Sequence, residues 1–593
     1  MSISSYAQQD TLKHRQDSIR IMDDKKENKI IKDVRDYSKN GNLLSQMLNR
    51  IMVEPQERLD QWDYSYLEYE RFKGKYIRNI TIDTREVFGG DPTDTTHKPN
   101  IIEKAGDFFH IKTRKWIVRN QLLFKGGDEL FPFQLAETER LLRSRNYLYD
   151  ANVRVISVGK DSVDVIVTTR DLWSLNPGLS WDNKDKAAAI SLQENNFLGL
   201  GFTTTFGVVI GQPYQPLGWD YEGGLRFENL FARYLHFDLI RDVDQYGTIH
   251  RIRAQRQFET PLIDFAGGID YQWFDRDIYL ITRDTVLLNN QHFHSQEYWL
   301  GYGTSLFNRY DFQNEYYGGI SYRKVAYQNS SHEIMDHFQD NSWVLAKAGY
   351  AFRRYKKTRF VIGLGRNEDI PIGQIFTLTG GYVHGDRQHK WYTGAKVGYS
   401  LFQEKFGYLS LLAEAGSFLY QQQFNEYTYR LDLLYFTNLY KIGHYRLRHF
   451  LRFEYAAIEQ PSQLNNAVHL DGEQGIRGFN LSLFGNKKVL VNYEINLFPP
   501  IKFLGFNFAG VGFFDFGFLA TRGESLWDGR FFSGTGLGLK IRNENLIFQS
   551  VQVMFGYYPQ DVLSNPQMNL FSQQRDFYNF KSYRFEKPDI VRF

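Results

Sequence analysis

Two stretches of this sequence contain residue types that could do chemistry. His384-Gly385-Asp386 offers a base and a carboxylate, which a hydrolase would combine with a nucleophile. No serine in a nucleophile setting stands near them in the sequence, so a polar loop is the preferred interpretation. Gly534-Thr535-Gly536-Leu537-Gly538 has the glycine content of a nucleotide-binding loop, but no strand-turn-helix context accompanies it. These glycines are better explained as strand positions where a strand bends or a loop approaches.

The residue inventory argues against several classes of site. The chain has no cysteine, which removes disulfides, thiolate ligands and cysteine nucleophiles and suits an exported protein. His, Asp and Glu show no recognisable metal spacing, so no metal and no cofactor are expected. Mean hydropathy is −0.47, and no run reaches the roughly 18 apolar residues of a membrane helix. A protein that crosses the membrane with helices is therefore excluded.

The composition favours a membrane protein of another kind. Aromatic residues make up 17% of the chain, although 23% of the residues are charged. This combination follows from a transmembrane β-barrel, whose strands alternate lipid-facing apolar and lumen-facing polar residues between two aromatic girdles. The net charge of +3 gives no reason to expect a nucleic-acid partner.

Two segments near the C-terminal end show this alternation most clearly. In residues 488–497 the apolar face contains Val489, Val491, Tyr493, Ile495 and Leu497, and the other face contains Lys488, Leu490, Asn492, Glu494 and Asn496. Turning the polar face to lipid would cost several kcal/mol. In residues 506–519, Phe508, Phe514, Phe516 and Phe518 are expected to face lipid, with Asn507, Phe513, Asp515 and Gly517 inside. Glu494 and Asp515 are thus predicted to be lumen-facing carboxylates.

Three parts of the chain must position these carboxylates. Residues 1–70 are polar, include a helical patch over Leu43–Met52, and are expected to form an arm. Residues 71–172 are expected to form a compact module, and residues 173–593 a transmembrane antiparallel barrel. Dividing the length from Ala187 to Phe593 by about 25 residues per strand and connection predicts roughly sixteen strands, with a margin of two. Ser5-Tyr6-Ala7 resembles the end of a secretory cleavage site.

The module has the sequence pattern of a βααββ unit. Alternation at Ile80 and Ile82 predicts a first strand, and helices are expected over residues 113–124 and 133–145. Two further strands flank the turn Gly159-Lys160-Asp161, with Ala151, Val153, Val155, Val163, Val165 and Val167 on their buried face. Two basic groups are expected to be solvated. They are Arg140, Arg143 and Arg145 on the second helix, and Arg353, Arg354, Lys356, Lys357 and Arg359 in a strand connection. The second group could alternatively meet anionic lipid head groups.

Several local features resemble the BamA/TamA superfamily of outer-membrane proteins, also called bacterial surface antigens. The resemblance covers about Tyr76 to Phe585, and within it the small module resembles a POTRA domain. Residues 194–201, Glu-Asn-Asn-Phe-Leu-Gly-Leu-Gly, are similar to that family's turn between the first two barrel strands. More specific is a run in the long connection near 460–486, which resembles the family's lid-loop motif Val-Arg-Gly-Phe or Val-Arg-Gly-Tyr. It consists of Gly475, Ile476, Arg477, Gly478 and Phe479.

The resemblance implies that this loop folds back into the barrel. Its arginine would contact acidic and aromatic positions on the following strands, which here are Glu494, Phe513, Asp515 and Gly517. A guanidinium in a narrow lumen needs such a carboxylate partner. Gly478 is expected to permit a sharp turn, and Phe479 to hold the loop by apolar contact. The last strand is expected at Phe577–Phe585, so a terminal recognition signal ends at Phe585 or at Phe593.

The resemblance further implies an outer-membrane assembly or insertion factor rather than an enzyme, with the module in the bacterial periplasm. An unstable seam between a first strand at Ala187–Phe197 and the last strand would pair with an incoming strand. The expected partners are the outer-membrane bilayer, unfolded outer-membrane or secreted client proteins, and periplasmic or lipoprotein accessory subunits. Two alternatives stay open: a two-partner-secretion-type transporter that exports one dedicated protein, and a barrel enzyme such as a hydrolase or protease.

Overall fold

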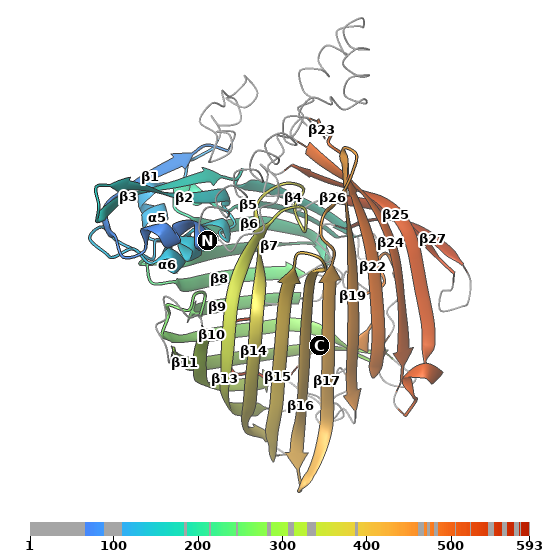
Figure 1. Cartoon of the computed structure of the whole chain (residues 1–593). Coiled ribbons are helices and arrows are strands. Elements are labelled where there is room, and N and C mark those ends of the chain that lie inside the picture. Colours follow the sequence, from blue (N-terminus) through green and yellow to red (C-terminus); the bar gives the residue numbers. More distant parts are fainter. Residues whose placement is uncertain are drawn as a thin grey trace, which may run out of the picture.

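The computed structural model describes most of the chain from residue 66 onward. The described ranges are 66–87, 110–182, 187–212, 215–244, 247–281, 286–305, 314–328, 340–385, 389–459, 468–470, 475–479, 484–503, 506–521, 523–543, 551–559, 566–573, 580 and 583–591. The expected arm up to residue 65, with its patch Leu43–Met52, lies outside them. Figure 1 shows a small module against one end of a large barrel.

The module is a three-stranded sheet covered by helices. Its elements are η1 (Leu67–Phe72), β1 (Tyr76–Arg85), α5 (Lys115–Arg119), α6 (Pro132–Arg143), β2 (Leu148–Val158) and β3 (Ser162–Asp171). The sheet order is β1-β3-β2, with β1 parallel to β3 and β2 antiparallel to it. The alternating valines of β2 and β3 are buried, because one face of the sheet packs under the helices. The element order agrees with the predicted βααββ pattern.

The first helix is shorter than the sequence predicted. The expected helix over residues 113–124 is limited to α5, which ends at Arg119. Phe124 is buried in the module as expected, but a turn brings it there, and Trp116 remains half exposed. The apolar residues between 113 and 124 are therefore spaced as in a helix although they do not lie on one continuous helical face. A turn, and not a helix, brings Phe124 into the core.

The barrel begins at β4 (Leu175–Asp182) and ends at β27 (Gln567–Gln573). The strands between them are β5 (Ala187–Glu194), β6 (Phe202–Gln212), β7 (Gln215–Leu230), β8 (Leu235–Asp244), β9 (Gly247–Arg256), β10 (Phe265–Ile281), β11 (Val286–Thr304), β12 (Asn314–Gln328), β13 (Asn341–Thr358), β14 (Glu368–Gly385), β15 (His389–Gln403), β16 (Gly407–Tyr420), β17 (Gln423–Phe436), β18 (Tyr440–Ile442), β19 (Tyr445–Glu459), β22 (Lys487–Phe498), β23 (Lys502–Phe503), β24 (Phe506–Ala520), β25 (Arg530–Asn543) and β26 (Val551–Tyr558). The paired registers between barrel strands are antiparallel, and the strand order closes β27 onto β4. This β27–β4 pairing is the closure of the barrel.

The prediction of about sixteen strands was wrong. Within the described residues the barrel contains twenty-two strands, of which β18 and β23 only continue β17 and β22 along the same neighbours. The estimate assumed about 25 residues per strand and connection, but the six strands from β4 to β9 all lie within residues 175–256. The predicted first strand, Ala187–Phe197, corresponds to β5, the second strand of the barrel.

The predicted last strand, Phe577–Phe585, was also wrong. The described part of the barrel ends at β27, and residues 583–591 lie in no strand. Tyr583 and Phe585 are buried together with Phe258 and Tyr317, which belong to the inner side of the barrel. Phe585 therefore does not end a barrel strand, and Phe593 lies outside the described residues. We call residues 583–591 the lumen segment.

The outer surface of the barrel is apolar. Leu179, Leu300, Leu537 and Leu570, on four different strands, are each between 70% and 80% exposed. Inward positions of the same wall carry buried charges such as Asp515, Glu494 and Arg448. A bilayer solvates such an outer surface, whereas water would not. Among the described residues, no helix combines the length and apolar composition needed to cross a membrane.

Candidate functional site

Two neighbouring strands present carboxylates to the inside of the barrel. In β22 the buried residues alternate from Leu490 through Asn492 and Glu494, while Tyr493 points outward. In β24 the register places Asp515 opposite Asn492. Because side chains alternate along each strand, both carboxylates project from the same inner wall. Glu494 and Asp515 are almost completely buried, so each needs a cationic or hydrogen-bonding partner.

Arg477 supplies that partner from the lid-loop motif. Its Nε and Nη2 donate to the two oxygens of Asp515 over 2.9 Å and 2.7 Å, which is a bidentate pair. Its Nη1 donates to Glu494, and its backbone N–H donates to Asp515 over 3.0 Å. The guanidinium also lies 4.7 Å from the ring centre of Phe513. The structure thus brings together Arg477, Glu494, Phe513 and Asp515, which we call the arginine cluster.

The rest of the motif fixes the loop backbone. Gly478 adopts φ +70°, a conformation that glycine reaches without strain. Ile476 is fully buried, and the ring of Phe479 packs against Phe532 and Tyr558. The carbonyl oxygen of Gly475 accepts a 3.1 Å hydrogen bond from Asn492. Gly517 lies close to the side chain of Leu470, which precedes the motif, and not against Arg477; a Cβ atom at Gly517 would collide with Leu470.

The lid loop also reaches the closure of the barrel. Tyr558, the last residue of β26, donates a hydrogen bond to the carbonyl oxygen of Arg477. Asn569 of β27 donates a 3.1 Å hydrogen bond to the carbonyl oxygen of Gly478. The loop therefore joins β22 and β24 through the arginine cluster to β26 and β27 through its backbone. The sequence motif did not predict this link to the last strand.

A second charged site joins the module to the barrel, and here the sequence-based expectation was wrong. Arg140, Arg143 and Arg145 were expected to be solvated, but all three are buried. Arg143 binds Asp369 of β14 over 2.7 Å, and Arg145 binds Glu259 over 2.9 Å. The helix α6 lies between its own sheet and the barrel rim. The barrel therefore covers the face of α6 that points away from the sheet of the module. We call these three residues the docking arginines.

The basic run at the end of β13 and just after it forms the other side of this interface. Its members, Arg353, Arg354, Lys356, Lys357 and Arg359, were expected in a solvated connection or at lipid head groups. Instead, Lys357 binds Glu139 of α6 over 2.6 Å. Arg353 donates to the carbonyl oxygen of Glu259 over 3.2 Å, as Arg140 does over 3.0 Å. Glu139 and Glu259 are thus shared by cations from both bodies, a role that no local sequence signal indicated.

The two shared carboxylates have strongly lowered pKa values. Burial alone would raise the pKa of Glu139, but Lys357 and Arg143 outweigh it and bring the pKa to about 2. Burial opposes ionisation of Glu259 in the same way, while His236 and Arg145 lower its pKa to about 2. Both groups are therefore ionised in the docked state at neutral pH.

The predicted turn over residues 194–201 contributes a third contact between the two bodies. It joins β5 and β6 rather than the first two barrel strands. Asn196 donates a 2.9 Å hydrogen bond to Thr113 of the module, and Arg114 N–H donates to the carbonyl oxygen of Gly199 over 3.0 Å. Gly199 has φ +72°, and a Cβ atom there would collide with the carbonyl of Lys112. The glycine thus permits close contact between the barrel and the module.

The remaining candidates occupy strand positions. Gly534-Thr535-Gly536-Leu537-Gly538 lies within β25, and a Cβ atom at Gly534 would approach Tyr558 and Ile476 of the lid-loop site. This bears out the interpretation as strand glycines that a loop approaches. His384 and Gly385 end β14, where His384 stacks on His389, and Asp386 lies outside the described residues. In the described part of the chain, no group of three or more His, Asp or Glu side chains could hold a metal ion.

Comparisons with known proteins give neighbours among solved structures only. No family model and no curated protein matches the sequence. The chain is similar to BamA from Haemophilus ducreyi lacking POTRA domains 1–3, with 10% identity and a TM-score of 0.36, over 84% of this chain and 83% of that one. It is similar to CdiB from Acinetobacter baumannii, with 12% identity and a TM-score of 0.34, over 87% of this chain and 76% of that one. It is also similar to CdiB from Escherichia coli, with 11% identity and a TM-score of 0.37, over 84% of this chain and 74% of that one.

Proposed function

We propose that this protein is a non-enzymatic outer-membrane factor that assembles or inserts other proteins by opening its barrel between β27 and β4. The observation that carries the proposal is the link between the lid loop and the closing strand. Asn569 of β27 binds Gly478, while Arg477, one residue earlier, is fixed to Glu494 and Asp515. The arginine cluster can therefore support or release the strand at which the barrel closes.

The strand lengths favour opening at this position. Strands β4, β5 and β26 contain eight residues and β27 contains seven, whereas β13 and β14 contain eighteen each. Hydrogen bonds between strands increase with the paired length, so the short closure is the easier pairing to separate. Two separated edges would each expose unpaired N–H and C=O groups, and an unfolded client strand could add to them.

The module would receive clients on the periplasmic side. Its sheet has β1 and β2 at its two edges, and the beginning of β1 is already bonded to residues 127–130. An extended client segment can add through backbone hydrogen bonds where such an edge is not already bonded. The docking arginines hold this sheet at the barrel rim, so a client bound there starts close to the barrel. The proposed partners are the outer-membrane bilayer, unfolded outer-membrane or secreted proteins, and periplasmic or lipoprotein accessory subunits.

Reconstitution tests the proposal. The purified protein in liposomes is mixed with an urea-unfolded barrel protein, and client folding is followed by its heat-dependent migration on gels. Arg477→Ala should slow client folding at least several-fold. Arg241→Ala is the matched control, because Arg241 of β8 binds Asp220 of β7 over 2.5 Å, away from the lid loop. Equal activity of liposomes with and without the protein would reject the proposal.

A dedicated transporter is the second candidate, favoured by the space inside the barrel. A cavity of about 400 Å³ lies beside the lumen segment. Export through the lumen would require that segment to move. Depletion of the protein in its own cells separates the two functions: loss of many unrelated outer-membrane barrels supports an insertion factor, and loss of one secreted or surface protein supports a transporter.

A further inference from the structure

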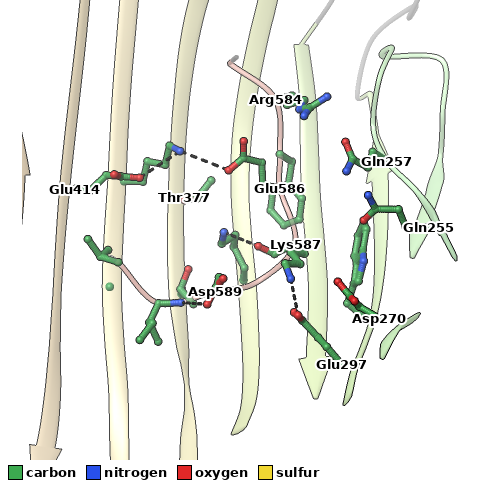
Figure 2. A pocket seen from close by; sticks show the side chains of 18 of the residues that line it. Gln255, Gln257, Asp270, Glu297, Thr377, Glu414, Arg584, Glu586, Lys587 and Asp589 are labelled. Atoms are coloured by element: carbon green, nitrogen blue, oxygen red, sulfur yellow. Dashed lines mark hydrogen bonds and ion pairs between the residues drawn. The ribbon is translucent and has the colours of Figure 1, made fainter. Parts of the chain in front are cut away.

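The lumen segment, residues 583–591, lies against the inner wall of the barrel. Figure 2 shows it running past side chains of several strands, with Lys587 turned toward Glu297 and Glu586 toward the opposite side of the cavity. Among the described residues, no strand includes any part of this segment. The segment is therefore held in the lumen by side-chain contacts rather than by a strand ladder.

Two aromatic residues anchor the beginning of the segment. Tyr583 is 1% exposed, and its hydroxyl lies 2.6 Å from the Ser410 hydroxyl of β16. Phe585 is 2% exposed, with its ring stacked on Tyr317 at 5.1 Å and edge-on to Phe258 at 5.9 Å. Aromatic pairs at these separations add to the free energy of burial. Residues two apart thus enter two separate subsites, as in an extended peptide.

Charged and polar groups hold the next part. The ammonium of Lys587 binds Glu297 of β11 over 2.5 Å, and Lys347 of β13 donates to the carbonyl oxygen of Lys587 over 2.9 Å. The next carbonyl, that of Pro588, accepts a 3.0 Å hydrogen bond from Ser321. The wall therefore binds both a side chain and consecutive backbone carbonyls, which is how proteins recognise extended peptides.

The far end of the segment is also bound, because the backbone N–H of Val591 donates to the Tyr392 hydroxyl of β15 over 2.8 Å. In the middle of the segment, Glu586 lies 3.8 Å from Lys396. Pro588 has no N–H and so cannot donate to a neighbouring strand. Beside the segment a cavity of about 400 Å³ remains, lined by charged residues that include Arg251, Asp270 and Glu414.

We propose that the inner wall formed by Ser321, Glu297, Lys347, Tyr392 and Ser410 is a binding site for an extended peptide. The ligand pattern is aromatic-x-aromatic-x-Lys-Pro, and the chain's own lumen segment occupies the site as a tethered, exchangeable ligand that closes the lumen. A tethered ligand acts at an effective concentration of roughly millimolar, so it excludes free peptide until it is displaced. The proposal does not depend on opening at the closure.

Peptide binding tests the site directly. The probe is a fluorescein-labelled peptide with the sequence of residues 583–591, added to the full-length chain in lipid nanodiscs. Replacing Tyr583, Phe585 and Lys587 by alanine within the chain should increase probe affinity at least tenfold over the unchanged protein. A probe carrying the same three alanines should not bind. Equal binding of the two probes, or no binding to the triple variant, would overturn the peptide site.

A charge exchange tests the plug independently of any loss of folding. Lys587→Glu and Glu297→Lys each place like charges together, and the double variant restores an opposite pair. In planar bilayers each single variant should increase ionic conductance several-fold, and the double variant should return toward the conductance of the unchanged protein. Conductance that stays unchanged in Lys587→Glu, or additive increases in the double variant, would contradict a lumen closed by this segment.

Discussion

Asn569 of the last barrel strand donates a 3.1 Å hydrogen bond to the carbonyl oxygen of Gly478 in the lid loop. Through this bond the lid loop directly contacts β27, the strand at which the barrel closes. The adjacent Arg477 carries the loop's charge pairing, so a single short turn couples two buried carboxylates to the closure. The first three predictions concern this turn.

Removal of the Asn569 amide should weaken the closure without disturbing the arginine cluster. Asn569→Ala removes one hydrogen bond, and we expect about 1 kcal/mol lower stability. The measurement is the temperature at which the barrel loses its folded migration on SDS gels. Asn425→Ala is the control, because Asn425 donates to a backbone carbonyl on β17, away from the lid loop. An equal effect of both substitutions would show that the lid-loop bond has no special part in the closure.

Removing Arg477 alone should lower the free energy of unfolding more than removing Arg477 together with the charge of Asp515. Arg477→Ala leaves Glu494 and Asp515 buried without their cation, and such a broken pair costs about 3–5 kcal/mol. Adding Asp515→Asn to Arg477→Ala should recover part of this loss, since one uncompensated charge is removed. Denaturant unfolding of the single and double variants measures the difference. Strictly additive losses would contradict the coupling of these residues.

Gly478 should tolerate no side chain. It combines φ +70° with close approach to Tyr558 and Phe571, so a methyl group is both strained and obstructed. Gly478→Ala should destabilise the folded barrel by more than about 1 kcal/mol. Gly443→Ala separates the two causes, because Gly443 has φ +60° with no atom within 4 Å of an added Cβ. Equal losses in both variants would mean that strain alone matters and that the loop does not pack tightly.

Docking of the module should weaken at acid pH. The pKa values of Glu139 and Glu259 are both about 2 in the docked state, against an ordinary value of 4.5. A lowered pKa stabilises the ionised state, so the full contribution is present above about pH 4.5 and is lost as pH falls toward 2. The groups facing Glu139 are Tyr69, Arg143, Asp150 and Lys357, and those facing Glu259 are Tyr234, His236, Arg140 and Arg145.

Hydrogen exchange of α6 measures this effect once the intrinsic pH dependence of exchange is removed. In the unchanged protein, the protection of the α6 backbone amides against exchange should fall between about pH 4.5 and pH 2. In Glu139→Gln the fall should be smaller, because one of the two titrating groups is gone. Protection that is constant over this range would contradict an electrostatic dock.

The arginine cluster was accessible from the sequence for a simple reason. Strand alternation with a period of two assigned Glu494 and Asp515 to the inner face, and a distinctive motif supplied Arg477. The docking arginines were not accessible in this way. Arg140 and Arg143 lie on α6 and Arg145 follows it, in a pattern typical of an exposed helix face, and the partners Asp369 and Glu259 lie far away in the sequence. Burial by a second body leaves no local signal.

The lumen segment shows a related limit. Tyr583 and Phe585 alternate with Arg584 and Glu586, which indicates extended backbone but not its surroundings. An extended segment inside a barrel and a strand facing lipid have the same alternation, because both project alternate side chains to opposite sides. Only the subsites at Ser410 and Tyr317, which come from other strands, distinguish the two.

A reversible lock at the closure tests the central proposal most directly. Because the chain has no cysteine, one cysteine placed in β4 and one in β27 form the only available pair, and oxidation joins the two strands. Client folding in liposomes should stop on oxidation and return on reduction, whereas either single-cysteine variant should be unaffected. Full activity of the oxidised, joined protein would show that clients do not enter between β27 and β4.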